Sequence, residues 1–217
     1  MTLALYGHPF SSYTWKALIA LYANETPFEF RSVGGENPEY DAFVASAGPS
    51  GQFPVLADGE TTVFEATSII EHLHLNHPGP ATLLPADPGG AIRTRMWDRV
   101  FDLHVMSPMQ EIVGEYIRHP DAPDPALRER IEARLDRSYR WIEQWLETYT
   151  RRDWITLVEC AAAPSLFYAD WVYRIPAACP RLIAWRAHLL ALPPVARCVE
   201  DARPFRQYFP LGAPDRD

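Results

Sequence analysis

A segment rich in proline and glycine between His77 and Gly90 divides the chain into two parts with different hydrophobic patterns. Proline and glycine at this density interrupt helices and strands alike. Before this segment, short β-like runs alternate with helical ones from residue 3 to about residue 76, whereas beyond about residue 90 only helical periodicity is present. The sequence therefore predicts an α/β domain at residues 1–78, a linker at residues 79–89 and an all-helical domain at residues 90–217.

The first part is expected to fold as a strand, a helix and a strand, followed by a hairpin and a second helix. Residues 3–6 form an apolar run, and residues 27–33 alternate between apolar and charged side chains, as strands do. Because a helical stretch joins these two strands, we expect them to pair in parallel. Residues 55–57 and 62–64 flank a short glycine-containing loop that is typical of a hairpin. The helix between the first two strands is indicated by apolar residues at helical spacing, Trp15, Leu18, Ile19 and Tyr22.

Two capping boxes predict where helices begin. Ser68 with Glu71 fits the start of the helix after the hairpin, and Thr156 with Glu159 fits the start of a helix in the second part. The second of these helices is apolar on all sides as far as about Trp171. We therefore expect it at the centre of a helical bundle.

Helical spacing extends through most of the second part. Apolar side chains recur at this spacing over residues 92–101, 127–146 and 182–189, and Pro180 suits the first turn of the last of these helices. Pro108 is expected to kink the helix that begins near residue 92. The second part is therefore predicted to be an all-α helical bundle.

Composition and charge exclude several classes of protein. Of the 217 residues, 47% are apolar and 22% are charged, which is ordinary for a folded globular chain. The net charge of -8 gives no overall attraction to nucleic acid or to an anionic membrane surface. The N-terminal residues lack the basic region and long apolar run of a signal peptide, and no stretch approaches 18 apolar residues. We therefore expect a cytoplasmic protein that binds neither nucleic acid nor membrane.

Neither the cysteines nor the histidines indicate a metal site in the sequence. The three cysteines lie far apart without a paired motif, so no disulfide framework or zinc knuckle is predicted. His72, His74 and His77 are close in sequence, but positions two apart point to different helix faces. No acidic or thiolate partner is evident beside them, so no metal site is predicted.

Three motifs resemble the cytosolic glutathione transferase family. Gly51–Leu56, Glu65–Ile70 and Thr156–Glu159 match that family in residue type, order and spacing. The resemblance covers nearly the whole chain. It implies a thioredoxin-like N-terminal domain, an all-helical C-terminal domain, glutathione as co-substrate without a metal, a homodimer and a role in detoxification.

Glutathione chemistry requires a group that stabilises a sulfur anion. A free thiol has a pKa of about 8.5, and only its thiolate form is a nucleophile. Ser11 lies where the first strand passes into the first helix, beside the positive end of that helix. The segment Ser11–Lys16 resembles the serine-type signature of zeta-class transferases, in which the first serine serves the thiol. Ser11 is therefore our predicted catalytic residue, with Ser12 and Tyr6 as alternatives and a simple helix cap as the non-catalytic interpretation.

The remaining glutathione contacts are implied by the same resemblance. Phe53-Pro54 resembles the cis-proline step that presents its backbone to the glutathione peptide, and Glu65 suits the γ-glutamyl ammonium. Gln52 stands where relatives often carry a lysine near the glycine end of glutathione. Lys16 and Arg31 are less suited to replace that lysine, because charged residues on a helix or strand are expected to be solvated. Gln110 is predicted to reach glutathione from the helical domain. The predicted binding residues are Ser12, Gln52, Phe53, Pro54, Val55, Glu65, Ala66 and Gln110.

An apolar site for the second substrate is predicted beside Ser11. The arginine that zeta-class enzymes use for a dicarboxylate substrate falls on Trp171 here, which favours a hydrophobic electrophile. The alternatives are isomerisation of an unsaturated acid, a non-catalytic ligand carrier, and peroxide or disulfide reduction. The predicted pocket residues are Phe10, Tyr13, Met106, Met109, Tyr168 and Trp171.

Overall fold

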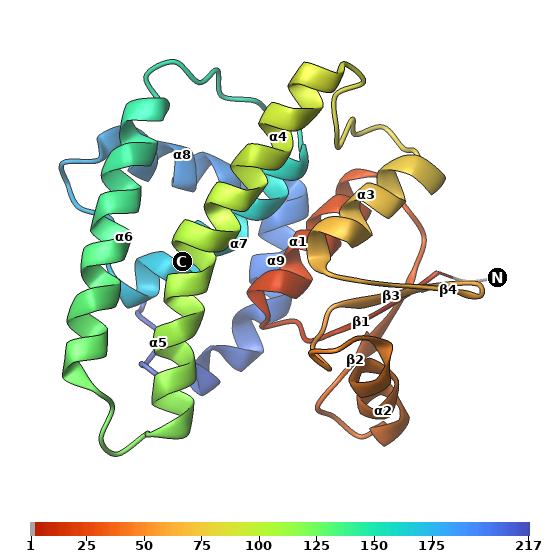
Figure 1. The fold of residues 1–217 in the computed structure, drawn as a ribbon, viewed down its shortest axis with the longest axis horizontal. Coiled ribbons are helices and arrows are strands. Elements are labelled where there is room, and N and C mark those ends of the chain that lie inside the picture. The colour runs from red at the N-terminus through yellow and green to blue at the C-terminus, as the bar shows by residue number, and fades with distance from the viewer. Residues whose placement is uncertain (1–2) are drawn as a thin grey trace.

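A four-stranded mixed sheet forms the N-terminal part of the protein in the computed structural model, which describes residues 3–217 (Figure 1). The strands lie in the order β2-β1-β3-β4. Strand β1 pairs in parallel with β2, and β3 runs antiparallel to both β1 and β4. This confirms the predicted parallel pair and hairpin. The strands are β1 (Ala4–Gly7), β2 (Glu29–Ser32), β3 (Val55–Asp58) and β4 (Thr61–Phe64).

The two faces of the sheet carry separate cores because side chains alternate along a strand. Leu5 faces helices α1 (Ser12–Ala23) and α3 (Ala66–Asn76) and joins the main core. Tyr6 faces α2 (Pro38–Ala47) in a smaller core. Figure 1 shows α1 and α3 on one side of the sheet and α2 on the other. Helix α2 was not predicted, although Tyr40, Phe43, Val44 and Ala47 recur at helical spacing and pack in this smaller core; of these only Val44 is fully buried.

Helices make up the rest of the chain, as predicted. None of the helices within residues 3–217 is both long and apolar enough to span a membrane. The division of the chain at residues 78 and 90 stays a prediction. The elements are α4 (Pro88–Phe101), a π-helical turn (Asp102–Met106), α5 (Ser107–Arg118), α6 (Pro125–Trp145), α7 (Leu157–Val172), α8 (Pro180–Ala191), α9 (Pro193–Ala202) and a 3-10 helix (Arg203–Tyr208).

Helix α7 is the centre of the bundle, and all of its residues are buried. Its predicted capping box is present: Thr156 Oγ1 accepts a hydrogen bond from the Val158 amide, and Glu159 Oε2 accepts one from the Thr156 amide at 2.9 Å. The capping box predicted at Ser68 is wrong. Helix α3 already begins at Ala66, so Ser68 lies inside its first turn.

The predicted kink lies one turn before Pro108, at the π-helical turn. Proline lacks an N–H group, and its ring crowds the carbonyl four residues earlier. That carbonyl belongs to His104, and it accepts a hydrogen bond from Ser138 Oγ of α6 at 2.8 Å instead. The Ser107 side chain donates to the Asp102 carbonyl at 2.9 Å across the widened turn. The irregular turn thus retains hydrogen-bond partners and bends the chain between α4 and α5.

Lys16, the only lysine of the sequence, is fully buried where α1 meets α4. Its Nζ lies 2.8 Å from Asp98 Oδ1, 2.7 Å from Asp102 Oδ1 and 3.1 Å from Thr67 Oγ1. Burial raises the pKa of Asp102, and the Lys16 ammonium opposes this rise. The expectation that Lys16 is solvated is wrong, because α1 is enclosed by α3, α7 and α9. The expectation for Arg31 is also wrong in part, since Arg31 pairs with Glu29 and Tyr6.

Replacing Lys16 by methionine should destabilise the protein by about 3–5 kcal/mol at neutral pH, because Asp98 and Asp102 lose their buried counter-ion. The loss should shrink in acid, where the Asp102 carboxylate, whose pKa burial already raises, takes up a proton, and grow as the pH rises. Urea denaturation followed by circular dichroism measures both effects. Arg95→Ala, which breaks a solvent-exposed pair with Glu71, is the control and should cost less than about 1 kcal/mol. A similarly small cost for Lys16→Met would contradict the interpretation.

Candidate functional site

Two neighbouring cavities lie between the sheet and the helices. The first has a volume of about 320 Å³ and is lined mainly by apolar residues, among them Phe10, Met109 and Phe209. The second, of about 230 Å³, is lined mainly by polar groups. Phe53 lines both cavities, so they adjoin at this residue. Together they form one elongated site with an apolar end and a polar end.

Ser11 is the N-cap of α1 and lines the first cavity. Its Oγ accepts a hydrogen bond from the Thr14 amide at 3.2 Å. This contact uses the oxygen as an acceptor and leaves the hydroxyl hydrogen available as a donor. The Ser11 side chain can therefore cap α1 and, at the same time, donate a hydrogen bond to an anion in the cavity.

Ser12 lies beside the same cavity but is engaged differently. It is buried, and its Oγ accepts a hydrogen bond from Gln110 Nε2 of α5 at 2.9 Å. Gln110, predicted to reach across from the helical part, therefore lies at the cavity and contacts Ser12. This contact joins α1 to α5 directly beneath the cavity.

The two tyrosines considered as donors lie in different places. Tyr6 belongs to the core under α2, where its hydroxyl accepts a hydrogen bond from Arg31 and its ring packs 4.3 Å from that of Phe43. That core is on the opposite face of the sheet from α1. Tyr13 lines the second cavity, and burial, followed by the charge of Asp102, raises the pKa of Tyr13. A raised pKa keeps this phenol protonated.

Residues of the loop before β3 and of the start of α3 form the polar end of the site. Gln52, Pro54, Glu65 and Ala66 line the second cavity, and the Phe53-Pro54 peptide bond is cis, as predicted. Val55, which follows it, is fully buried in β3. The Glu65 side chain makes no capping hydrogen bond to the first turn of α3. The amides of that turn can therefore bind an anion.

Six residues that line the second cavity were missed by the sequence reasoning: Ser50, Phe64, Arg99, Asp102, Leu103 and Ser107. Of these, Arg99, Asp102 and Ser107 reach the cavity from α4, the π-helical turn and α5. Arg99 Nη2 donates to Thr67 Oγ1 at 2.9 Å and to Asp102 Oδ2 at 2.8 Å, and its side chain is about half exposed. Nothing in the sequence indicates that this helix meets α3, because the contact joins residues about 30 positions apart.

The apolar end contains half of the residues predicted for it. Phe10, Met109 and Tyr168 line the first cavity, and Tyr168 donates a hydrogen bond to the Phe10 carbonyl at 3.0 Å. Met106 is fully buried in the core, and Tyr13 belongs to the second cavity. Trp171 is buried behind the wall, with its ring 5.2 Å from that of Phe209. Lining residues that the sequence did not indicate are His8, Val113, Ile117, Tyr208, Phe209 and Pro210.

Among the described residues that line the first cavity, the titratable side chains are His8 and two tyrosines. Burial lowers the pKa of His8, so its ring is neutral at pH 7. Its Nδ1 accepts a hydrogen bond from the Phe10 amide at 3.1 Å, which leaves the hydrogen on Nε2. The described lining contains neither lysine nor arginine. The apolar end of the site is therefore without a full positive charge at neutral pH.

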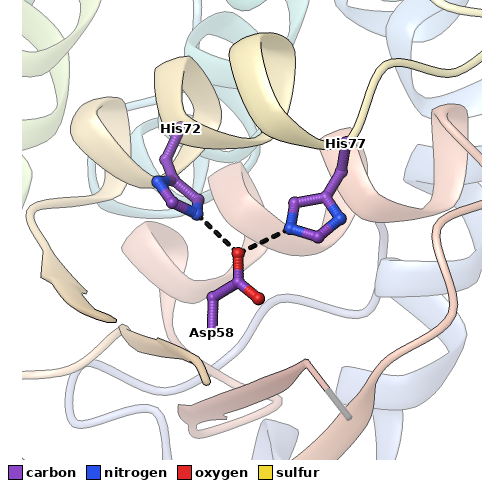
Figure 2. A group of neighbouring side chains, drawn as sticks. All are labelled: Asp58, His72 and His77. Carbon is purple, nitrogen blue, oxygen red and sulfur yellow. Dashed lines mark hydrogen bonds and ion pairs between the residues drawn. The ribbon is translucent and has the colours of Figure 1, made fainter. Parts of the chain in front are cut away.

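The sequence reasoning about the histidines was wrong on one point. Asp58 is an acidic partner for His72 and His77, although it lies 14 and 19 residues before them. Figure 2 shows both rings directed at the same carboxylate. Hydrogen bonds from His77 and then His72 hold the pKa of Asp58 below its usual value. His74 is not part of this group.

Comparisons with known proteins agree with this geometry. The family model described as "Glutathione S-transferase, N-terminal domain" matches residues 5–81. A probable maleylacetoacetate isomerase of Vibrio cholerae is 27% identical over 217 residues, which cover 94% of this chain and 98% of that protein. A glutathione S-transferase of Silene vulgaris is 37% identical over 82 residues, which are 36% of each chain.

Solved structures extend the similarity to most of the fold. The apo structure of glutathione S-transferase III is 27% identical to this chain, with a TM-score of 0.74 and coverage of 92% of this chain and 96% of that one. A glutathione S-transferase of Methylobacterium radiotolerans, in complex with glutathione sulfonate, is 25% identical, with a TM-score of 0.73 and coverage of 92% and 95%. The likeness thus includes both the sheet and the helices.

The backbone of Glu65 offers a test of strain at the site. Its φ of 67° lies in a region that favours glycine, and non-glycine residues there cost about 1–3 kcal/mol. Glu65→Gly and Glu65→Ala both remove the carboxylate, but only glycine relieves the backbone. We expect Glu65→Gly to be more stable than Glu65→Ala by about 1 kcal/mol in urea denaturation. Equal stability of the two variants would show that the backbone there is unstrained.

Proposed function

We propose that this chain is a cytosolic glutathione transferase that conjugates glutathione to hydrophobic electrophiles, with Ser11 stabilising the thiolate. The observation that carries this proposal is the position of Ser11: its hydroxyl caps α1 and lines a cavity whose other walls are mostly apolar. A nucleophilic sulfur and an apolar acceptor would meet there. The polar cavity beside it suits the rest of the tripeptide.

In this proposal the γ-glutamyl group of glutathione occupies the second cavity. Glu65 pairs with its ammonium group, and the amides of the first turn of α3, starting at Ala66, bind its carboxylate. Arg99 adds a positive charge on the same side, which offsets the missing hydroxyl at Ala66. The backbone of Phe53, Pro54 and Val55 would pair with the cysteinyl part of glutathione. Gln52 would bind the glycine carboxylate through a neutral hydrogen bond.

The energy available at Ser11 is sufficient for thiol activation. Lowering a thiol pKa by about two units requires about 2.7 kcal/mol of preferential stabilisation of the anion. A hydrogen bond to a charged group contributes about 1.5–3 kcal/mol, and a helix N-terminus adds about 0.3–1 kcal/mol. Ser11 provides the first, and α1, which begins at Ser12, provides the second. Gln110 supports this arrangement by holding Ser12 and thus the start of α1.

The second candidate is glutathione-dependent isomerisation of an unsaturated acid. The near full-length match to a probable maleylacetoacetate isomerase favours it, as does a partial match, 31% over 126 residues, to a maleylpyruvate isomerase of Ralstonia. The absence of lysine and arginine from the described lining of the first cavity favours an uncharged electrophile instead. A non-catalytic ligand carrier would bind glutathione without turnover of either substrate class.

We also propose a cytoplasmic homodimer, with the domain division at residues 79–89. Three large apolar side chains on α4 and the following turn, Ile92, Met96 and Leu103, are at least about half exposed, and a partner subunit would cover them. Light scattering of the purified protein should give twice the 24.7 kDa chain mass. A mass near that of a single chain would contradict the dimer.

Replacing Ser11 by alanine should lower kcat/KM for conjugation about 10- to 100-fold, because one hydrogen bond to the thiolate is lost. The pH–rate profile should move toward higher pH, since the anion then forms less readily. The measurement is conjugation of a chromogenic aromatic electrophile across a pH series. An unsaturated dicarboxylate, followed for isomerisation in parallel, distinguishes the second candidate.

Two controls accompany Ser11→Ala. Tyr6→Phe should leave the rate unchanged, because Tyr6 lies on the other face of the sheet. Ser12→Ala should have a smaller effect than Ser11→Ala, since it only releases Gln110. Full turnover by Ser11→Ala, with loss in either control, would transfer the catalytic role to that residue. Glutathione binding by the wild type without turnover of either substrate class would support the carrier.

Arg99→Ala should raise KM for glutathione about tenfold, equivalent to about 1.4 kcal/mol, and leave kcat nearly unchanged. The reason is that Arg99 meets the γ-glutamyl end of glutathione, far from the reacting sulfur. Arg95→Ala is the matched control on the same helix, because Arg95 pairs with Glu71 and lines neither cavity. An unchanged KM in Arg99→Ala would remove Arg99 from the binding site.

A further inference from the structure

A second group of side chains with ligand chemistry lies apart from both cavities. Strand β3 ends at Asp58, the last turns of α3 carry His72, and His77 is the C-cap that follows the last residue of that helix. These residues line neither cavity. The hairpin and the end of α3 therefore meet at a cluster that the proposed transferase chemistry does not use.

The donor atoms of this cluster converge on one point. His72 Nε2 lies 2.8 Å from Asp58 Oδ2, and His77 Nε2 lies 2.6 Å from the same oxygen (Figure 2). One ligand atom from each of the three residues lies within 4.8 Å of the other two. The ligands of a tetrahedral zinc ion lie about 2.0–2.1 Å from the metal and hence about 3.3 Å from one another. The His72-to-Asp58 and His77-to-Asp58 distances would need to open by about 0.5 Å and about 0.7 Å to admit an ion.

The side chains have room for this adjustment. The exposed fractions of His72, Asp58 and His77 are 17%, 25% and 30%. All three are thus partly exposed, and none belongs to either hydrophobic core, so small shifts of these side chains leave both cores intact. Solvent also reaches the cluster, and a water molecule can complete the coordination of an ion held by three protein ligands.

The type of ligand selects the type of metal. Two imidazole nitrogens with one carboxylate oxygen suit zinc, cobalt and nickel, whereas calcium and magnesium prefer sets made of oxygen. We propose that Asp58, His72 and His77 bind one divalent transition-metal ion of the zinc type. The ion joins the β3–β4 hairpin to the end of α3 and thereby raises the stability of the folded protein.

Binding requires a change in the protons of the cluster. Each Nε2 that donates a hydrogen bond to Asp58 must lose its hydrogen to bind the metal, so a neutral ring carries its hydrogen on Nδ1 instead. The Asn76 amide lies 3.2 Å from His72 Nδ1. The same amide nitrogen donates to the His72 carbonyl oxygen at 3.0 Å, so the new Nδ1 hydrogen would be directed to water, which is one of the outer-shell partners of metal-bound histidines.

The test is a zinc titration of tag-free protein after treatment with a chelator. We expect one zinc ion per chain at this site, measured by competition with a chromophoric chelator, and cobalt bound there should give visible absorption bands of low-symmetry coordination. His72→Ala, His77→Ala and Asp58→Asn should each weaken zinc binding by more than about 100-fold, because loss of an outer-shell partner alone costs 10- to 100-fold. His74→Ala is the matched control on the same helix and should bind as the wild type does.

Thermal unfolding provides a second readout. Zinc should raise the unfolding temperature of the wild type and of His74→Ala, and leave that of His72→Ala and Asp58→Asn unchanged. The proposal is overturned if the wild type shows no saturable zinc binding, or if Asp58→Asn and His72→Ala bind zinc as tightly as His74→Ala. In either case the three residues only form hydrogen bonds that join the hairpin to the end of α3.

Discussion

The buried ammonium group of Lys16 is the contact on which the arrangement of the site depends. It is fully enclosed, and it binds Asp98 and Asp102 of the helical part while it belongs to α1, the first helix of the N-terminal part. Removing charges from water costs several kcal/mol per ion, and close geometry with additional hydrogen bonds offsets that cost. Thr67 and Arg99 complete this set of contacts. Helices α1, α3 and α4 are thereby held together, and the two cavities form beside them.

The N-termini of α1 and α3, two of the helices that Lys16 holds together, make the site favourable for anions. Helix α1 begins beside the first cavity, with Ser11 as its cap, and α3 begins beside the second, after Glu65. Helix N-termini carry a partial positive charge and unpaired amides. In the proposed complex, the thiolate of glutathione lies at the N-terminus of α1, and its γ-glutamyl carboxylate lies at the N-terminus of α3. The unusual φ of Glu65 at the second start fits this account, since strained residues concentrate at binding sites.

Features set by neighbours in sequence could be predicted, and features set by tertiary contact could not. The parallel strand pair, the hairpin and the Thr156 capping box follow from local patterns, and all three are present. Helix α2 was missed even though Tyr40, Phe43, Val44 and Ala47 lie at helical spacing, because its other residues are exposed and the helix is short. The burial of Lys16 and the approach of Asp58 to two histidines depend on segments brought together only by folding. Within the site, Ser11 was indicated by its place in a turn, whereas Arg99 and Phe209 gave no local signal.

The central claim is that the Ser11 hydroxyl lowers the energy of the glutathione sulfur anion. The most direct measurement is the ultraviolet absorbance of the thiolate of bound glutathione, followed as the pH is raised, in the wild type and in Ser11→Ala. The thiolate should form in the wild type well below the pH at which free glutathione ionises, and Ser11→Ala should move this transition toward the free value. Identical transitions in the two proteins would show that Ser11 does not stabilise the anion.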